Sequence, residues 1–372
     1  MATRMQTFDD WMDLFKGWQK DIGLDVGELG DYQWQIKFGE LEQSEIEFGA
    51  YAGHTKWETL MEVPDQRIRD ALLNLIRVQG DTEFASTEQQ RELFDTAPSD
   101  FDRHSLARII CEETRHGWQM AYLLVTYFGT SGKVEAQKLL ERRAFKKTRL
   151  LGAFNEDIRN WLDMYAFTEF IDRDGKYQLK MESFSAFAPF ARSMGPMLKE
   201  EQFHLGTGHN GLKRILRAQK IPVALIQKYF NKWIPAAYDL FGTDHSSSAQ
   251  WAYAWGVKGR FDENTAAEPA DPERLNEHAR QLFYQECLGL IDNLNLLVAE
   301  DQPRLYMPAV SFGRRIGAYA DQPYSVQGEL LSPEAYARHC EEVLPTAADG
   351  DLIQDLTRDS DWIEPKKAGL EA

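Results

Sequence analysis

Apolar residues recur at helical spacing along most of the chain, and this pattern predicts a mainly helical protein. One face of a first helix, over 8–20, carries Phe8, Trp11, Phe15 and Trp18. From residue 64 onward the same periodicity predicts helices over 65–92, 100–128, 133–145, 156–183, 189–217, 220–240 and 271–298. A last helix is expected to begin near Ser332, where Ser-Pro-Glu combines an N-cap with a proline in the first turn.

The remaining segments lack this periodicity. Residues 34–63 alternate apolar and polar positions between glycines, which predicts a small hairpin. Residues 242–272 mix serine, glycine and acidic residues and predict a loop. After Pro303, RLYMPAVSFGRRIGAYADQPY combines aromatic residues with turn formers and predicts a second small β element, and the last twenty or so residues are expected to be loosely held. We therefore expect three parts: an N-terminal extension over 1–63, a helical bundle over 64–240, and a C-terminal extension over 241–372 that packs on the bundle.

Composition excludes several classes of partner. The chain has 372 residues, of which 43% are hydrophobic and 27% charged, and its formal net charge is −17. So acidic a protein repels nucleic-acid phosphates and anionic lipid, and we expect neither partner. No apolar run reaches the roughly 18 residues of a membrane span, and MATRMQTFDDWMDLF lacks the apolar core of a signal peptide, so we expect a cytoplasmic protein. The three cysteines are far apart and are expected to be reduced thiols, all three buried as small apolar residues.

Polar residues interrupt apolar helix faces at six positions. Glu83 extends the stripe of Leu72, Ile76 and Gln79, and on the next long helix an apolar face contains Glu113 and His116. The same arrangement then repeats, with Asp172 on one helix and Glu201 and His204 on the next. The interval from the first carboxylate to the Glu-x-x-His motif is 30 residues in one pair and 29 in the other.

This repeat predicts a dinuclear metal site in a ferritin-like four-helix bundle. Two helix pairs that each give one carboxylate and one Glu-x-x-His motif form the ligand set of di-iron and di-manganese bundles. Four carboxylates and two imidazoles suit a pair of hard to borderline divalent ions better than a lone zinc. The alternative, a buried set satisfied by other protein groups, is less favoured because six unpaired polar groups in a core are costly. Glu112, Glu169 and Glu200 fall on other helix faces, where we expect them to be solvated or to support the ligands from outside.

Around these residues the sequence resembles a known family, the oxygenase component of benzoyl-CoA 2,3-epoxidase, a branch of the phenylacetyl-CoA epoxidase type of di-iron proteins. The resemblance rests on QGDTEFASTEQQR (79–91), EETRHGW (112–118), FNEDIRNWL (154–162), FIDRDGKYQL (170–179) and MLKEEQFHLG (197–206), and more weakly on WGVKGRFDE (255–263) and FGRRIGAYAD (312–321). Carried over by position, it implies the same six ligands: Glu83, Glu113, His116, Asp172, Glu201 and His204. The chain is shorter than typical members, which leaves the acyl group open.

The resemblance implies epoxidation of the ring of an aryl-CoA thioester, benzoyl-CoA or a related aryl- or arylacetyl-CoA, with O2 and two irons. The chain has no flavin or nicotinamide fingerprint, so a separate reductase must supply two electrons. The resemblance implies a flavin and iron-sulfur partner that uses NADPH. Two alternatives stay open: another di-iron oxygenase or desaturase acting on an acyl thioester, and a ferritin-like protein that stores iron or scavenges peroxide.

Candidate substrate contacts are less specific. Gln79, one turn before Glu83, is placed to hydrogen-bond a substrate carbonyl. Two basic groups could bind coenzyme A phosphates or an acidic electron donor: Arg142, Arg143, Lys146, Lys147 and Arg149 in one run, and Arg314 with Arg315 in another. A solvated helix face is an equally good interpretation of the first run.

Overall fold

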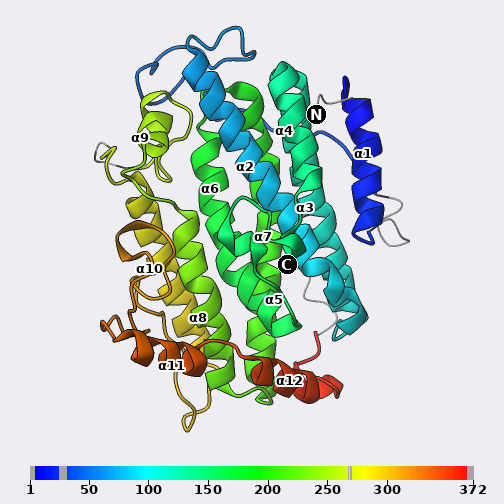
Figure 1. Ribbon diagram of the computed structural model, residues 1–372, viewed down its shortest axis with the longest axis vertical. Helices are drawn as coiled ribbons and strands as arrows, with labels where there is room; N and C mark the ends of the chain where they lie inside the picture. Colours follow the sequence, from blue (N-terminus) through cyan, green and yellow to red (C-terminus); the bar gives the residue numbers. More distant parts are fainter. Residues whose placement is uncertain (1–4, 25–31, 267, 269, 367–372) are drawn as a thin grey trace.

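The computed structural model describes residues 5–24, 32–266, 268 and 270–366, and it consists mainly of helices joined by loops (Figure 1). Within those ranges no β-strand forms, and the strand-like pairings are three isolated bridges: Glu45 with Thr55, Trp57 with Phe187, and Tyr324 with Leu330. The mainly helical class is thus confirmed, whereas the two predicted β elements are wrong. None of the helices in the described part is long and apolar enough to cross a bilayer.

The two segments predicted as β elements are irregular chain with one side buried. In the first, Ile46 and Phe48 are buried while Phe38 is exposed. In the second, Leu305 and Phe312 are buried. An extended chain with one side against a helical core alternates apolar and polar residues as a strand does, since successive side chains point in opposite directions. The sequence pattern therefore could not separate the two cases.

Four long helical segments form the centre of the molecule and contain the predicted ligands. They are α2 (Gln66–Gln90), α3 (Asp100–Tyr127), the run α5–η4–α6 (Trp161–Phe167, Thr168–Asp172, Arg173–Ser183) and α7 (Ala188–Ala218). The helix α2 packs along α3, the run α5–η4–α6 packs along α7, and α3 contacts α7 between the two pairs (Figure 1). The ends of α2, α3 and α7 agree with the predicted ranges to within two residues.

Local sequence explains where these helices begin. The side chains of Asp65, Ser99 and Asn160 each accept a hydrogen bond from a backbone N–H in the first turn, as N-cap residues do. The Asn160 cap explains why the third segment begins at Trp161 and not at the predicted residue 156. A separate 3₁₀ turn, η3 (Gly152–Asn155), precedes it.

Outer helices surround this centre. They are α1 (Phe8–Asp21), α4 (Gly129–Glu141), α8 (Val223–Leu240), α9 (Ser247–Ala254), α10 (Leu275–Asn295), α11 (Pro333–Val343) and α12 (Ala347–Leu356). Two of them correct the sequence prediction, because α9 lies inside the expected loop and α12 was not predicted. The helix α11 follows its Ser332 cap as expected. Figure 1 shows α11 and α12 near the lower ends of the other helices.

The C-terminal part is held more firmly than predicted. Ile353, Trp362 and Ile363 are buried, and the backbone N–H of Glu364 donates to the carbonyl oxygen of Arg214 at 3.1 Å. Residues 367–372, which belong to the same prediction, lie outside the described residues. All three cysteines are free, and Cys111 and Cys287 are buried as expected, whereas Cys340 is partly exposed and corrects the prediction.

Candidate metal centre

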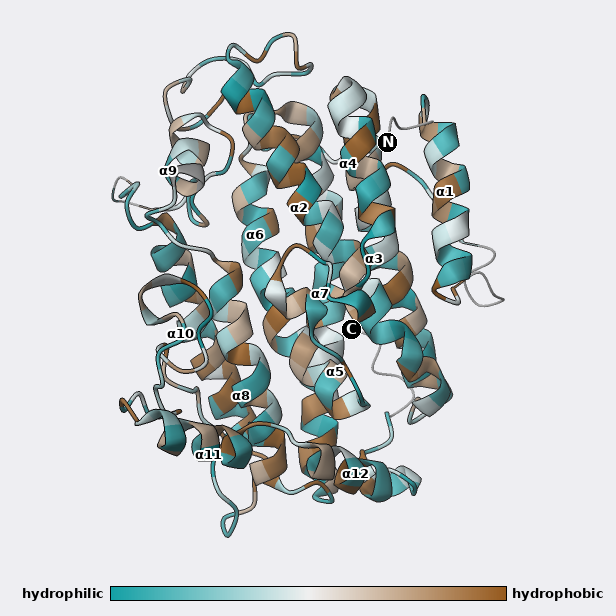
Figure 2. Cartoon of the chain, viewed as in Figure 1, coloured by the Kyte–Doolittle hydropathy of each residue, from teal (hydrophilic) through white to brown (hydrophobic). Residues whose placement is uncertain are grey.

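The structure brings the six predicted ligands together inside the bundle. Hydrophilic residues recur along α3, α6 and α7 in the middle of the molecule (Figure 2). The ligands form two groups in which one atom from each residue lies within 4.8 Å of the others: Glu83, Glu113 and His116 in the first, and Glu113, Asp172, Glu201 and His204 in the second. All six are buried, and Glu113 belongs to both groups. An arrangement with a shared carboxylate fits two adjacent metal ions.

Both histidines turn Nδ1 toward the carboxylates. The Nδ1 atom of His116 lies 3.3 Å from Glu83 Oε2 and 3.6 Å from Glu201 Oε1. The Nδ1 atom of His204 lies 3.3 Å from Glu201 Oε2 and 3.5 Å from Glu113 Oε1. One carboxylate oxygen of Glu201 thus faces each histidine, so Glu201 lies between His116 and His204.

The other ring nitrogen of each histidine contacts a carboxylate from the opposite helix. His116 Nε2 on α3 lies 2.8 Å from Glu200 Oε2 on α7, and His204 Nε2 on α7 lies 3.0 Å from Glu112 Oε2 on α3. An ionised carboxylate only accepts hydrogen bonds, so Nε2 donates and Nδ1 is left for a metal. Of the two expectations for Glu112 and Glu200, solvation or support of the ligands, the structure therefore shows support.

The sequence contained a signal for these partners. Each motif is Glu-Glu-x-x-His, at 112–116 and again at 200–204, and the second glutamate of each pair is the predicted ligand. The side chain of the first glutamate of each pair contacts the histidine of the other motif. Glu169 has a different place: its Oε1 lies 3.0 Å from His209 Nδ1, and its Oε2 accepts from Arg173.

Crowded buried charges shift the titration of the site. Burial, together with the nearby charge of Glu83, holds the pKa of Glu113 well above its usual value, and burial with the charge of Glu201 does the same for the pKa of Asp172. Burial alone would lower the pKa of His204, but Glu201 and the other carboxylates around it raise that pKa well above the ordinary value. The site therefore favours protons or other cations among its carboxylates.

Two orphaned atoms test whether this cluster fits a metal. Asp172 Oδ2 and His204 Nδ1 are buried and have no hydrogen-bond partner. A buried polar atom without a partner is costly, and both atoms belong to the four-residue group. The donor set of carboxylate oxygens and imidazole nitrogens suits divalent iron or manganese. The residues present thus fit a pair of metal ions.

Asp172 lies at the end of a wide helical turn. Residues Thr168–Asp172 form the π-helix η4, and Asp172 is its last residue. The facing helix makes room for it, because a Cβ at Gly208 would lie 2.9 Å from the backbone nitrogen of Glu169, and one at Gly211 would overlap the ring of Tyr165. The sequence periodicity located Asp172 but did not predict the π turn.

Gln79 has a partner within the protein. Its Nε2 donates to Glu83 Oε1, so the amide orients a predicted ligand. The expected contact between Gln79 and a substrate carbonyl stays a prediction.

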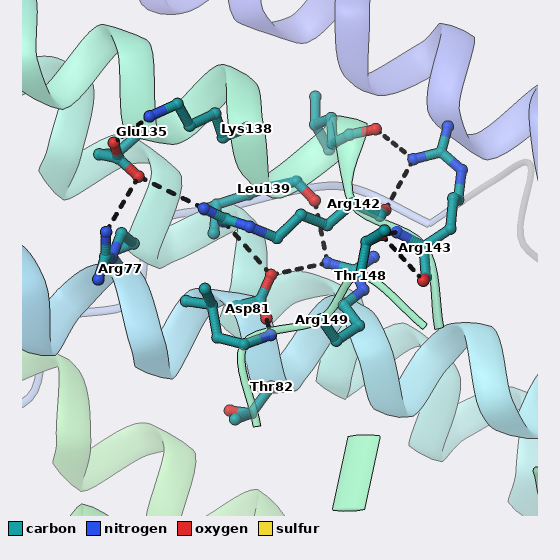
Figure 3. A network of polar contacts seen from close by, with 12 residues as sticks. Arg77, Asp81, Thr82, Glu135, Lys138, Leu139, Arg142, Arg143, Thr148 and Arg149 are labelled. Atoms are coloured by element: carbon teal, nitrogen blue, oxygen red, sulfur yellow. Dashed lines mark hydrogen bonds and ion pairs between the residues drawn. The ribbon is translucent and has the colours of Figure 1, made fainter. Parts of the chain in front are cut away.

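Most of the basic run at 142–149 is paired within the protein. Arg149 is fully buried, with Nη1 3.1 Å from Asp81 Oδ1 and Nη2 2.8 Å from Glu88 Oε1 (Figure 3 shows the contact with Asp81). Arg142 lies between Asp81 and Glu135, and Arg143 pairs with Asp21 at 2.6 Å. These arginines fasten the loop after α4 to α2 and α1, so their charges are already balanced by carboxylates.

The remaining basic candidates are divided between the interior and the surface. Arg314 is buried against Asp239. Lys146 and Lys147 are exposed, and Lys147 Nζ lies 2.8 Å from Asp157. Exposed Arg315 lies 2.8 Å from Glu156. Lys147 and Arg315, although far apart in sequence, thus pair with two consecutive residues, Asp157 and Glu156.

Comparison with known proteins gives a family match and two relatives. The family described as phenylacetic acid catabolic protein matches residues 59–277, which include all six predicted ligands. The chain is 35% identical over 388 residues to benzoyl-CoA oxygenase component B of Aromatoleum evansii, covering 92% of this chain and 80% of that protein. It is 22% identical over 266 residues to one of the subunits of 1,2-phenylacetyl-CoA epoxidase from Escherichia coli (strain K12), covering 70% of this chain and 79% of the relative.

Proposed function

Because the chain belongs to the phenylacetic acid catabolic protein family, we propose that it is the oxygenase component of an aryl-CoA epoxidase, with a ferritin-like bundle that holds two irons. The observation that carries the proposal is the pair of overlapping ligand groups, buried and joined by Glu113. The ligands are Glu83, Glu113, His116, Asp172, Glu201 and His204. This is the donor set that ferritin-like bundles use for two ions.

Bound irons would supply O2 activation, in which one oxygen atom adds to a ring double bond and the other leaves as water. The balance requires two electrons and two protons for each epoxide. The chain's own residues hold the site: Glu112 and Glu200 fix the histidine rings, and Gln79 fixes Glu83. The six ligand residues are themselves buried, which limits their contact with bulk water.

Electrons come from a separate protein. The two relatives are named as a component and as one of several subunits, which supports a multicomponent oxygenase. The partner we propose is a flavin and iron-sulfur reductase that oxidises NADPH. Cys111, Cys287 and Cys340 are free and far apart in sequence, so they do not offer the cysteine set of an iron-sulfur cluster.

The substrate we propose is benzoyl-CoA or a related aryl- or arylacetyl-CoA. Support comes from the names of both relatives, which refer to aryl-CoA thioesters. The charges of Lys146, Lys147 and Arg315 are the candidates for contact with the CoA phosphates, because these side chains are exposed. The side chains of Arg142, Arg143 and Arg314 are at most 14% exposed.

Turnover with product identification tests this function. Iron-loaded protein, O2, NADPH and a reductase should convert benzoyl-CoA or phenylacetyl-CoA to a ring epoxide that contains one oxygen atom from labelled O2. Omission of the reductase should abolish NADPH oxidation. An unsaturated acyl product would reassign the chain as a desaturase. A large shell that takes up iron, with no thioester product, would support storage instead.

A further inference from the structure

An extended N-terminal segment lies across α3 and α7 and is anchored on both. The backbone N–H of Lys37 donates to Gln119 Oε1 at 2.9 Å, and Gln119 Nε2 donates back to the carbonyl oxygen of Lys37 at 2.9 Å. Two residues on, the N–H of Gly39 donates to the carbonyl oxygen of Arg192 on α7 at 2.8 Å. These backbone contacts fix the position of Lys37 independently of its side chain.

The Lys37 side chain reaches the carboxylate that supports His116. Its Nζ lies 2.6 Å from Glu200 Oε1, and Glu200 Oε2 accepts from His116 Nε2 at 2.8 Å. Arg115, whose side chain is fully buried, donates to the same oxygen of Glu200. Two cations therefore contact the carboxylate of Glu200, which supports His116.

The corresponding carboxylate behind His204 has weaker support. Glu112 accepts from Arg108 at 2.9 Å, and the Arg108 side chain is 52% exposed. The residue before the histidine is Phe203 here, where the first motif has Arg115, and Arg108 stacks over the Phe203 ring at 3.8 Å. Among the described residues, Arg108 is the cation paired with Glu112. The two halves of the site match in their carboxylates and histidines but differ in the cations behind them.

We propose that Lys37, acting through Glu200, makes the metal position beside His116 the weaker of the two. Positive charge next to a site repels a divalent ion, and a carboxylate engaged by two cations gives less negative charge to the histidine it supports. The His116 group also offers three ligands, against four in the His204 group. Lys37 is thus a positioning residue that sets the difference in affinity between the two metal positions. The inference rests on the proposed metal centre but not on the proposed substrate.

Titration of the metal-free full chain with Co²⁺ tests this, at fixed pH and without O2. We expect two binding steps in the wild type. Lys37→Met should tighten the weaker step by about tenfold, the lower end of the effect of residues around metal ligands, and leave the stronger step unchanged. Lys37→Arg should keep the wild-type constants because it keeps the charge. Circular dichroism should show the same helix content in both variants, because the backbone contacts of residue 37 remain.

Three further variants assign the steps. Glu83→Gln should remove the weaker step and Asp172→Asn the stronger one, since each ligand belongs to one group only. Arg108→Met is the matched control behind His204. It should tighten the stronger step and so increase the difference between the two binding constants. Equal constants in wild type and Lys37→Met, or a Lys37→Arg variant that behaves like Lys37→Met, would overturn the inference. Absence of any Co²⁺ binding would instead overturn the metal centre itself.

Discussion

His204 on α7 and Glu112 on α3 are joined by a 3.0 Å contact between Nε2 and a carboxylate oxygen, on the side of the ring that faces away from the other ligands. Because such a partner fixes both the tautomer and the orientation of a ligating histidine, Glu112→Gln should weaken the binding of one ion by about tenfold or more. Metal titration by calorimetry measures this. Glu286→Gln is a matched control, since Glu286 is paired with Arg173 and Lys176 and supports no ligand histidine. Identical binding in Glu112→Gln and wild type would contradict the role.

The shared position of Glu113 gives a prediction about stoichiometry. Purified protein should hold about two irons per chain, as a six-ligand dinuclear bundle requires. Glu113→Ala should lose both ions, whereas Asp172→Asn should lose one, because Asp172 belongs only to the second group. Iron determined by colorimetry after acid release, together with protein concentration, gives the ratio. Two irons retained in Glu113→Ala would disprove the ligand assignment.

A buried acid outside the six-ligand set predicts a pH dependence of stability. Burial raises the pKa of Glu182 on α6 to about 8, against 4.5 for the ordinary group, so the folded protein holds this proton while the unfolded chain releases it. Between these values the free energy of unfolding should fall by about 1 kcal/mol per pH unit from this group. Glu182→Gln removes the titrating group, so its stability relative to wild type should rise from pH 5.5 to pH 7.5. Urea unfolding at both pH values measures the difference, and a constant difference would refute the shift.

The exposed cations give a prediction about the thioester. Replacement of Lys146, Lys147 and Arg315 by glutamine should raise the KM for the CoA ester several-fold and make its binding less dependent on salt, because the phosphates lose their counter-charges. Equilibrium titration of the ester without reductase isolates substrate binding from partner docking. A triple variant of exposed residues elsewhere, Lys16, Lys220 and Arg358, makes the same change in net charge. Unchanged affinity in the first variant would assign these cations to the reductase, and equal affinity for the free acid would refute the thioester itself.

The sequence predicted most of the helices and the ligands for one physical reason. A residue such as Glu113 stands out because it occupies an apolar face at helical spacing, and local caps such as Ser99 mark where that face begins. The partners of the ligands were harder to predict, because Glu200 and His116 are 84 residues apart in the chain and lie on different helices. Lys37 carried no signal, since its place depends on backbone contacts to Gln119.

Other sequence predictions were wrong because the same pattern of residues fits two different structures. Alternation along residues 34–63 fits a hairpin and also fits irregular chain with one side buried against helices, which is the observed case. The cluster of arginines before residue 150 fits an exposed binding surface and also fits loop anchors. Arg149 is an anchor, because Asp81 and Glu88 on α2 are themselves buried and need a cation.

The crossed contacts between the two Glu-Glu-x-x-His motifs have a consequence for how such a centre could be built from smaller parts. A fragment with α2 and α3 alone would contain His116 but not the carboxylate that orients it, which is supplied by α7. One helical hairpin could therefore not form half a working centre by itself. Two copies of one hairpin placed face to face would each provide the missing carboxylate to the other. The pairing of the halves is thus reciprocal, and it makes a symmetric dimer of a single hairpin the smallest assembly with the same contacts between carboxylates and histidines.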